Sequence, residues 1–547
     1  MRTFSNLHRS EFVNELSTEQ YDLLVIGGGI TGCGIALDAA LRGLKVALVE
    51  KNDFASGTSS RSTKLIHGGL RYLKQMEFKL VHDVGSERAI VHRNARHVVI
   101  PEKMLLPIIK DGSLGKGATS LGLMVYDILA GVKSGERRIM LDRHATAKAE
   151  PLLTTDNLEG GGLYFEYRTD DSRLVIELAK SAYANGATLL NYTELTGFNH
   201  DANGKINAAK VTDKTTGNSY EIKTKLIVNA CGPWVDLLRK EDNSLKGKRL
   251  QLTKGVHIVL PYAKLPIQQA AYFDVPDGRM IFAIPRNNIT YVGTTDTVYN
   301  QEIDNPRCSL ADAQYLLNAV NNAFKGVNLT VDDIESTWAG LRPLIHEDGK
   351  SPSELSRKDE IMVSPSGLVS IAGGKLTGYR LMAEKIVNLA EKTLGKKHIA
   401  CQTKNYRLSG GEFDSKGDFE KSLSQLSIKG ATHGITGELV KEWFYRYGKN
   451  TDKIIDNVAV LKANIFDADA LYVQAEIKYA VENEMVQQLS DFLIRRTGKI
   501  FFDKPAAEKH IDNLNTALQI KLSLTDDAAS KSLQRVQEEF KQVTEFN

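Results

Sequence analysis

The sequence has few cysteines, no long apolar run and almost no net charge. Its four cysteines form no CxxC pair and are widely spaced, so neither a zinc site nor a disulfide framework is indicated. No stretch reaches the roughly 18 apolar residues of a spanning helix. The polar segment from Met1 to Gln20 has no signal-peptide core. We therefore expect a protein of the reducing cytoplasm that does not cross a membrane but could lie on one.

The near balance of charge also limits the partners. With 70 Lys+Arg against 67 Asp+Glu, the net charge of +3 gives no support for a nucleic-acid partner, although it leaves room for a local cationic pocket. Hydrophobic residues make up 42% and charged residues 25%, as in ordinary folded proteins. A chain of 547 residues exceeds one compact core, so two or three domains are expected.

A strand–helix–strand pattern begins near the N-terminus. Leu23–Ile26 is a short apolar run typical of a buried strand. Ile30–Arg42 is rich in Ala, Leu and Gly and predicts a helix that ends at Gly43, and Val46–Val49 predicts the next strand. This order predicts a βαβ unit in a parallel sheet.

A glycine motif lies at the turn of this unit. Gly27, Gly29 and Gly32 form GxGxxG between strand and helix, and Glu50 ends the next strand. These glycines suit a tight turn, close approach to a pyrophosphate and close helix–strand packing, while Glu50 could accept hydrogen bonds from ribose hydroxyls. The helix N-terminus offers N–H groups to phosphates. The pattern predicts dinucleotide binding rather than a plain glycine-rich turn, but does not separate FAD from NAD.

Later segments predict further parts of the fold. The runs at Leu226–Val228 and Leu368–Ile371 end in small residues and are expected to join the same sheet. Residues between them hold β-type runs such as Val256–Leu260, which suggest a mostly antiparallel sheet, and the chain after about 400 has long helical patterns. We predict an α/β fold with a Rossmann-like nucleotide-binding domain, a mostly antiparallel β substrate domain and a C-terminal all-α domain. The expected ranges are 20–110 for the first domain, continued by about 160–240 and 345–395; 245–340 for the second, with parts of 110–160; and 400–547 for the third.

The segment from Ser59 to Tyr72, SSRSTKLIHGGLRY, is a polar loop with hydroxyls, glycines and cations. By itself it is slightly better explained as a solvated loop than as one that wraps a cofactor. It resembles, however, the signature of the FAD-dependent glycerol-3-phosphate dehydrogenase family, within the D-amino-acid-oxidase-like flavoproteins. The resemblance continues through residues 228–234, 254–259, 293–296, 340–344, 373–377 and 491–497, and so spans nearly the whole chain. Departures are Gly378, where a second hydroxyl residue is expected, and Cys231, where a small residue suffices.

The resemblance implies non-covalent FAD and oxidation of sn-glycerol 3-phosphate to dihydroxyacetone phosphate. Hydride would pass from C2 to the flavin N5, and the electrons would then pass to a quinone. The nucleotide-binding domain would thus be an FAD-binding domain. The implied cofactor-binding residues are Gly27, Gly29, Ile30, Thr31, Gly32, Glu50, Lys51, Thr58, Ser59, Ser60, Ser62, Lys64, Leu65, His67, Gly68, Gly69, Ala230, Gly232, Gly374, Lys375, Leu376 and Thr377. No metal is expected.

The reaction needs a base, because the C2 hydroxyl loses a proton. His257 is the candidate, although a lone histidine among apolar strand residues is more often a core residue. His67 is the alternative, in a loop expected to lie nearer the flavin, and Arg342 completes the expected catalytic set.

The substrate phosphate needs cations that donate hydrogen bonds. Arg71, Arg342 and Lys375, with Tyr72 nearby, are expected to form one such pocket, since each cation lies beside glycine or proline at a predicted loop or strand end. The Gly373–Gly374 turn, before a helix expected near Thr377, would direct N–H groups at the flavin.

Two alternatives stay open at this stage. A glycerol-3-phosphate oxidase would pass electrons to oxygen and release hydrogen peroxide; family oxidases commonly carry an inserted segment, and none is obvious here. A non-catalytic flavin-binding or FAD-requiring tRNA-modifying protein would need a basic RNA surface, which the net charge does not support. The dehydrogenase would work as a peripheral protein on the inner face of the cell membrane. A homodimer and the role of the C-terminal region stay open.

Overall fold

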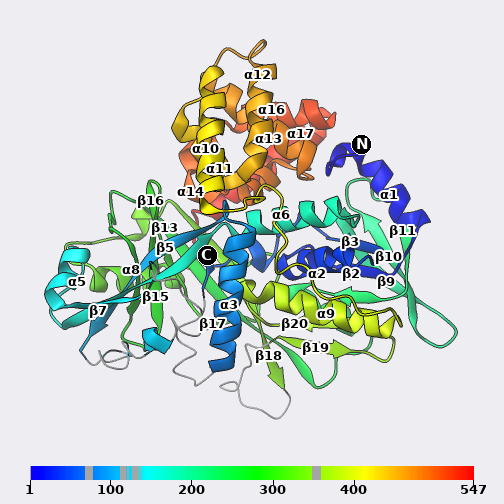
Figure 1. Ribbon diagram of the computed structural model, residues 1–547, viewed down its shortest axis with the longest axis horizontal. Helices are drawn as coiled ribbons and strands as arrows, with labels where there is room; N and C mark the ends of the chain where they lie inside the picture. The colour runs from blue at the N-terminus through cyan, green and yellow to red at the C-terminus, as the bar shows by residue number, and fades with distance from the viewer. Residues whose placement is uncertain are drawn as a thin grey trace.

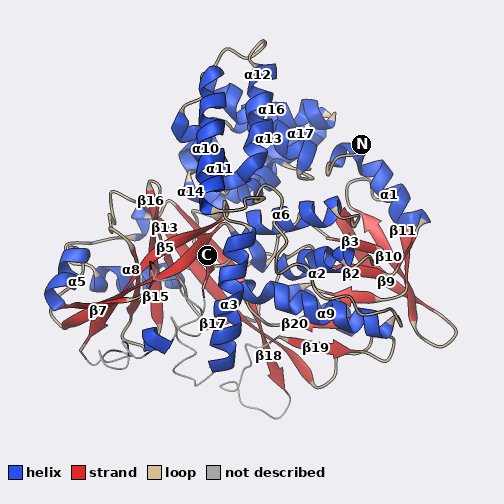
Figure 2. Ribbon diagram, viewed as in Figure 1, coloured by secondary structure: helices blue, strands red, loops and turns tan. Residues whose placement is uncertain are grey.

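The computed structural model describes residues 2–67, 78–110, 112, 119, 122–125, 135, 137–347 and 359–546. Figure 1 shows three parts: an α/β part at the right, a sheet-rich part at the left and a group of helices above them. Figure 2 shows the strands in the two lower parts, where helices accompany them, and helices without strands in the upper part. No helix among these residues is both long and apolar enough to span a bilayer.

A six-stranded sheet forms the centre of the α/β part, in the order β19-β20-β12-β2-β3-β8. All neighbouring pairs are parallel except β19 with β20. The strands are β2 (Leu23–Ile26), β3 (Val46–Val49), β8 (Thr188–Leu190), β12 (Ile227–Asn229), β19 (Glu360–Val363) and β20 (Val369–Ala372). The predicted strands near 226 and 368 therefore do join the βαβ sheet. Because a central parallel sheet is covered on both faces, its strands are continuous apolar runs, and every residue of β2 and β3 is buried.

Helices and a small sheet surround this core. Helix α2 (Ile30–Leu41) packs against α6 (Asp171–Ala184) and α9 (Tyr379–Thr393). A four-stranded sheet of β1 (Gln20–Tyr21), β9 (Thr193–His200), β10 (Ile206–Asp213) and β11 (Ser219–Thr224) lies beside it, in the order β1-β11-β10-β9. Because β9 follows β8 directly, it starts at the carboxyl edge of the central sheet.

The second large sheet has ten strands and is mostly antiparallel, as predicted. Its main order is β17-β13-β16-β15-β14-β5-β7-β4, with β18 on β13 and β6 on β7. The strands are β4 (Leu65–Ile66), β5 (Val99–Ile109), β6 (Ile139–Asp142), β7 (Leu158–Thr169), β13 (Lys248–Pro261), β14 (Ala270–Asp274), β15 (Met280–Arg286), β16 (Ile289–Gly293), β17 (Thr297–Val298) and β18 (Ser336–Glu347). Strands β5 and β7 thus pair in this sheet, although they lie partly in ranges expected for the FAD-binding domain. The domain boundaries stay a prediction.

The chain after residue 400 is helical, which confirms the third part of the predicted fold. Its helices are α10 (Lys416–Thr432), α11 (Gly437–Tyr447), α12 (Thr451–Leu461), α13 (Ala468–Asn483), α14 (Lys499–Phe502), α15 (Lys504–Lys509), α16 (Ile511–Leu522) and α17 (Asp526–Gln542). A π-helical turn, Asp491–Arg496, lies between α13 and α14. The other α-helices among the described residues are α1 (Arg9–Thr18), α3 (Phe78–Asn94), α5 (Arg143–Ala149), α7 (Val235–Glu241) and α8 (Leu310–Ala323). In α17, Val536 and Phe540 are buried, and the Thr525 side chain caps the N-terminus.

Candidate active site

A cavity of about 940 Å³ extends between the two large sheets. Its size falls in the range typical of sites for small molecules and cofactors. Residues of the Gly27–Thr31 turn, the loop after β3, the start of β9, the 230–238 segment, strands β13 and β18, and the turn after β20 line it. Sites at the carboxyl ends of parallel strands are typical of this architecture.

The glycine turn is shaped for a close approach. Gly27 has a φ of +110°, which side chains rarely adopt, and a Cβ there would lie 2.7 Å from the Ala230 carbonyl oxygen. Gly29 precedes α2 and, with Ile30, lines the cavity. The Ile30 N–H donates to Ser59 Oγ at 3.0 Å, which ties the turn to the loop after β3. The N-terminus of α2 therefore opens on the cavity, where its dipole favours a phosphate.

Glu50 lies beside this turn with a buried carboxylate. Its Oε2 accepts from the Gly28 N–H at 2.7 Å and its Oε1 from the Asn52 N–H at 2.9 Å. Burial raises the pKa of Glu50, and these two backbone hydrogen bonds oppose that rise. A buried acceptor at the end of the second strand is suited to ribose hydroxyls. Residues Thr193–Gly197 of β9 line the same end of the cavity.

Lys51 lies in a second polar contact at the rim. Its ammonium is 2.7 Å from Asp304 Oδ1, and it lies 4.7 Å from the centre of the Trp234 ring. Trp234 Nε1 donates to the same carboxylate at 2.7 Å. Lys51 and Trp234 line the cavity, so this contact joins the loop after β3 to the segment after β17 at its edge.

His257 is buried at the other end of the cavity, on β13. Its Nε2 is 3.0 Å from Thr63 Oγ1, and its ring stacks on Trp338 with the centroids 4.7 Å apart. The close neighbour Gly293 has to be small, because a Cβ there would lie 2.1 Å from the imidazole Cδ2. Burial, and then the charges of Arg342 and Lys64, hold the pKa of His257 well below its ordinary value. The ring is therefore neutral at pH 7, the form that accepts a proton.

Arg342 reaches the same end from β18. Its guanidinium donates to Thr294 Oγ1 at 2.9 Å and to the Thr295 carbonyl at 3.2 Å, and it lies 3.3 Å from Asp296 Oδ1. These contacts orient the guanidinium in the cavity wall. Lys375 and His67 line the same cavity. Four predicted site residues from four separate segments thus line one cavity: His67, His257, Arg342 and Lys375.

The family models match nearly all of the chain. The model described as FAD dependent oxidoreductase matches residues 22–380. This chain belongs to that family. A second model, described as the C-terminal domain of alpha-glycerophosphate oxidase, matches residues 401–529. The expectation of an FAD-dependent oxidoreductase is thereby confirmed.

Relatives of this flavoprotein extend over almost its whole length. The aerobic glycerol-3-phosphate dehydrogenase of Bacillus subtilis (strain 168) is 49% identical over 542 residues, covering 94% of this chain and 98% of the relative. The protein of the same name from Staphylococcus haemolyticus (strain JCSC1435) is 48% identical over 548 residues, covering 99% and 98%. The X-ray structure of the glycerol-3-phosphate dehydrogenase from Bacillus halodurans complexed with FAD has a TM-score of 0.86, with 42% identity and 99% of each chain covered.

The geometry of the cavity fits the FAD of this family. The glycine turn leaves room at the N-terminus of α2, and the buried Glu50 carboxylate lies next to it. The turn after β20 also lines the cavity with Gly373 and Gly374, followed by a short 3-10 turn, Leu376–Gly378, and then α9. The helix predicted near Thr377 thus begins two residues later, at Tyr379.

Not every predicted cofactor-binding residue lies in the cavity wall. Gly32, Ser60 and Lys64 do not line it; the Lys64 ammonium instead lies 2.5 Å from Asp171 Oδ1. The lining residues predicted from the sequence are Gly27, Gly29, Ile30, Thr31, Glu50, Lys51, Thr58, Ser59, Ser62, Leu65, His67, Ala230, Gly232, His257, Arg342, Gly374, Lys375, Leu376 and Thr377. Gly68, Gly69, Arg71 and Tyr72 lie outside the described residues.

Several lining residues were missed from the sequence. They include Arg61, Thr63, Glu194, Leu106, Trp234, Tyr272 and Phe282. Tyr272 and Phe282 stack with centroids 4.1 Å apart and form an aromatic wall near His67. No local pattern marks them, because the wall arises only when β14 and β15 pair. Among the described residues, no group of three or more His, Cys, Asp or Glu side chains could hold a metal ion.

Proposed function

We propose that this flavoprotein oxidises sn-glycerol 3-phosphate to dihydroxyacetone phosphate and passes the electrons to a quinone. The observation that carries the proposal is that His257, Arg342 and Lys375, from three separate segments, all line the cofactor cavity. A neutral base and two cations are what a secondary alcohol bearing a phosphate requires. The names of the Bacillus and Staphylococcus relatives support the same substrate.

In this proposal, Arg342 and Lys375 bind the substrate phosphate. Arg71 and Tyr72, outside the described residues, would complete that pocket. Thr294 and Thr295 already orient the Arg342 guanidinium, so little side-chain freedom is lost when the phosphate binds. Holding the phosphate fixes the position of C2 in relation to the rest of the cavity.

His257 accepts the proton of the C2 hydroxyl at Nε2 once that hydroxyl replaces Thr63 Oγ1 as the partner of the nitrogen. Before the substrate binds, Thr63, which lines the cavity, lies 3.0 Å from Nε2, and the stack on Trp338 fixes the plane of the ring. FAD, when bound, accepts the hydride that leaves C2. The backbone N–H groups of the Gly373–Gly374 turn are placed at the cavity wall to stabilise negative charge there. His67, on the neighbouring wall, is the alternative base.

A second candidate function is the oxidase, which passes the electrons to oxygen and releases hydrogen peroxide. The observation in its favour is the match of residues 401–529 to a model described from alpha-glycerophosphate oxidase. We prefer the dehydrogenase because the relatives at 48–49% identity over nearly the whole chain carry that name. A quinone is dissolved in the bilayer, so the proposal includes peripheral attachment to the cytoplasmic face of the membrane.

A comparison of electron acceptors tests this proposal. The purified protein is supplied with glycerol 3-phosphate and either dissolved oxygen or a soluble quinone analogue, and both acceptor reduction and hydrogen peroxide are measured. The dehydrogenase predicts faster turnover with the quinone and little peroxide. Stoichiometric peroxide with no gain from the quinone would favour the oxidase, and no turnover with either acceptor would contradict the substrate itself.

A further inference from the structure

Two consecutive arginines of the C-terminal region reach into the α/β part. Arg495 and Arg496 lie in the π-helical turn Asp491–Arg496. Arg495 Nε donates to Asp53 Oδ2 at 2.6 Å, and Arg496 donates to both oxygens of the same carboxylate at 2.7 and 2.9 Å. Asn191 Nδ2 donates to Asp53 Oδ1 at 3.1 Å. Asp53 and Arg496 are fully buried, so these charge-assisted contacts are shielded from water.

Asp53 belongs to the loop that shapes the cofactor cavity. Three residues before it, Glu50 accepts from the Gly28 N–H. Two residues after it, the Ala55 N–H donates to the Gly28 carbonyl at 3.0 Å. Farther along the loop, Ser59 accepts from the Ile30 N–H at 3.0 Å. The loop and the glycine turn are therefore hydrogen-bonded together on both sides of Asp53.

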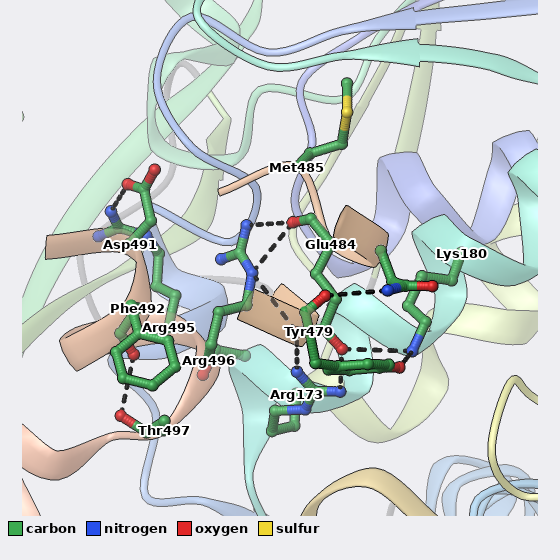
Figure 3. Close-up of polar contacts among 12 residues, drawn as sticks. Arg173, Lys180, Tyr479, Glu484, Met485, Asp491, Phe492, Arg495, Arg496 and Thr497 are labelled. Atoms are coloured by element: carbon green, nitrogen blue, oxygen red, sulfur yellow. Dashed lines mark hydrogen bonds and ion pairs between the residues drawn. The ribbon is translucent and has the colours of Figure 1, made fainter. Parts of the chain in front are cut away.

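The arginines are themselves held firmly in place. Arg496 donates to the Glu484 carbonyl at 2.7 Å, and the Glu484 carboxylate accepts from Arg173 of α6 at 2.7 and 2.9 Å (Figure 3). Arg495 donates to Asp491 Oδ1 at 2.6 Å, to which the Tyr192 hydroxyl also donates at 2.6 Å. These residues form one buried cluster, made up of Asp53, Arg173, Tyr192, Glu484, Asp491, Arg495 and Arg496. The cluster connects the helical part to the α/β part through more than one pair of residues.

The charges in this cluster are balanced only when it is intact. Burial alone would raise the pKa of Asp53, but the charges of Arg496 and Arg495 outweigh burial and lower that pKa, so the carboxylate stays ionised. Removing one partner of a buried ion pair leaves an uncompensated charge in a dry site. Whichever partner is removed, the contacts that hold the loop at Asp53 are weakened, and Glu50 and Ser59, which lie on the same loop, would shift with it.

We propose that Arg495 and Arg496 are positioning residues for FAD, which act through Asp53 on the loop that carries Glu50 and Ser59. The C-terminal helical region is then a part of the cofactor site, although none of its residues lines the cavity among those described. This inference rests on the placement of FAD in that cavity.

The test is the affinity of the full-length apoprotein for FAD, measured from the change in flavin fluorescence on binding. Asp53→Asn keeps the shape of the side chain and removes its charge, and Arg495→Gln removes one donor. For both variants we expect the FAD dissociation constant to rise by about 5- to 150-fold, the usual range of coupling between distinct sites. At saturating FAD, turnover should return to near the wild-type value, because neither side chain is placed to touch the substrate. Arg495→Lys, which keeps the charge, should recover part of the affinity.

Glu177→Gln is the matched control. Glu177 is fully buried and contacts Arg173 of the same cluster and Lys180, but not the loop. The Glu177→Gln substitution should lower the melting temperature of the apoprotein without changing the affinity of the apoprotein for FAD. An equal loss of affinity in Glu177→Gln and Asp53→Asn would show a general loss of stability and overturn the inference.

Wild-type affinity in Asp53→Asn or Arg495→Gln would also overturn the inference. If Asp53→Asn does not fold, Arg495→Gln decides alone, since an unchanged affinity in that variant overturns the inference by itself. Gly29→Leu separates this inference from the placement of FAD. If that variant retains FAD, the placement is wrong; if it loses FAD while the cluster variants do not, only the positioning role fails.

Discussion

His257 combines burial, a stacked ring and a hydroxyl partner at Nε2. Because burial keeps the imidazole neutral, we expect it to accept a proton in the reaction. Loss of a general base typically costs on the order of 10²- to 10⁴-fold in rate. His257→Ala loaded with FAD should therefore be reduced by glycerol 3-phosphate more slowly by that factor in anaerobic stopped-flow measurements. Reduction at the wild-type rate would move the base elsewhere, with His67 the next residue to replace.

In the proposed function, Arg342 binds the substrate phosphate. Each charge-assisted hydrogen bond contributes about 1.5–3 kcal/mol. Arg342→Ala should thus lower kcat/KM for glycerol 3-phosphate by about 10- to 150-fold. The loss should be much smaller for glycerol, which has no phosphate, and Arg71→Ala should behave alike. The same fractional loss on both substrates would show that these arginines do not recognise the phosphate.

Single residues also show where sequence reasoning stops. The convergence of His257, Arg342 and Lys375 could be expected, because each lies beside a motif of the family signature. Lys64 lies in the same signature, yet its ammonium contacts Asp171, a partner 107 positions away that no local pattern indicates. Trp234 and Asp304 are likewise far apart in the sequence, and their hydrogen bond forms only in the folded chain.

At the scale of elements, the glycine turn and α2 carry the strongest structural prediction. Gly29 lines the cavity, and a Cβ there would lie 3.2 Å from Ser59 Oγ, the acceptor of the Ile30 N–H. Gly29→Leu should therefore fill the phosphate position and abolish FAD binding. The FAD content of the purified protein is measured from its absorbance at flavin wavelengths. Gly437→Leu is the control, because that exposed glycine has open space around it and should keep its FAD.

Element patterns predicted most of the architecture, since buried parallel strands and amphipathic helices have strong local signals. The runs near 226 and 368 joined the βαβ sheet as expected. The role of β9 could not be foreseen, because it lines the cavity only through the pairing of β8 with β3. Helix α9 begins two residues after the predicted start because the 3-10 turn at Leu376–Gly378 comes before it, and this turn resembles the start of a helix in the sequence.

At the scale of the whole molecule, buried ion pairs connect the helical part to the α/β part. Burial raises the pKa of Glu484, but the charges of Arg173 and Lys180 outweigh this and lower the pKa from 4.5 to about 2. Because the folded pKa lies below the unfolded one, Glu484 stabilises the fold above about pH 4.5 and loses this effect as the pH falls toward 2.

Glu484→Gln should therefore destabilise the protein by about 3–5 kcal/mol near neutral pH, since it removes one of the two buried carboxylates that pair with Arg173. The difference in melting temperature between wild type and variant should narrow as the pH is lowered below 4.5. Calorimetry of both proteins between neutral pH and the acidic range below pH 4.5 measures this difference in melting temperature. A difference that stays constant with pH would mean that Glu484 is not ionised in the folded protein.

The proposed oxidation of glycerol 3-phosphate reduces the bound flavin, and anaerobic titration of the FAD-loaded protein tests it most directly. Glycerol 3-phosphate is added without oxygen, and the flavin absorbance band is followed, with glycerol as the comparison. We expect full bleaching at about one equivalent per flavin, slow or absent bleaching by glycerol, and dihydroxyacetone phosphate as the product. A flavin band that persists under excess glycerol 3-phosphate would contradict the proposed oxidation.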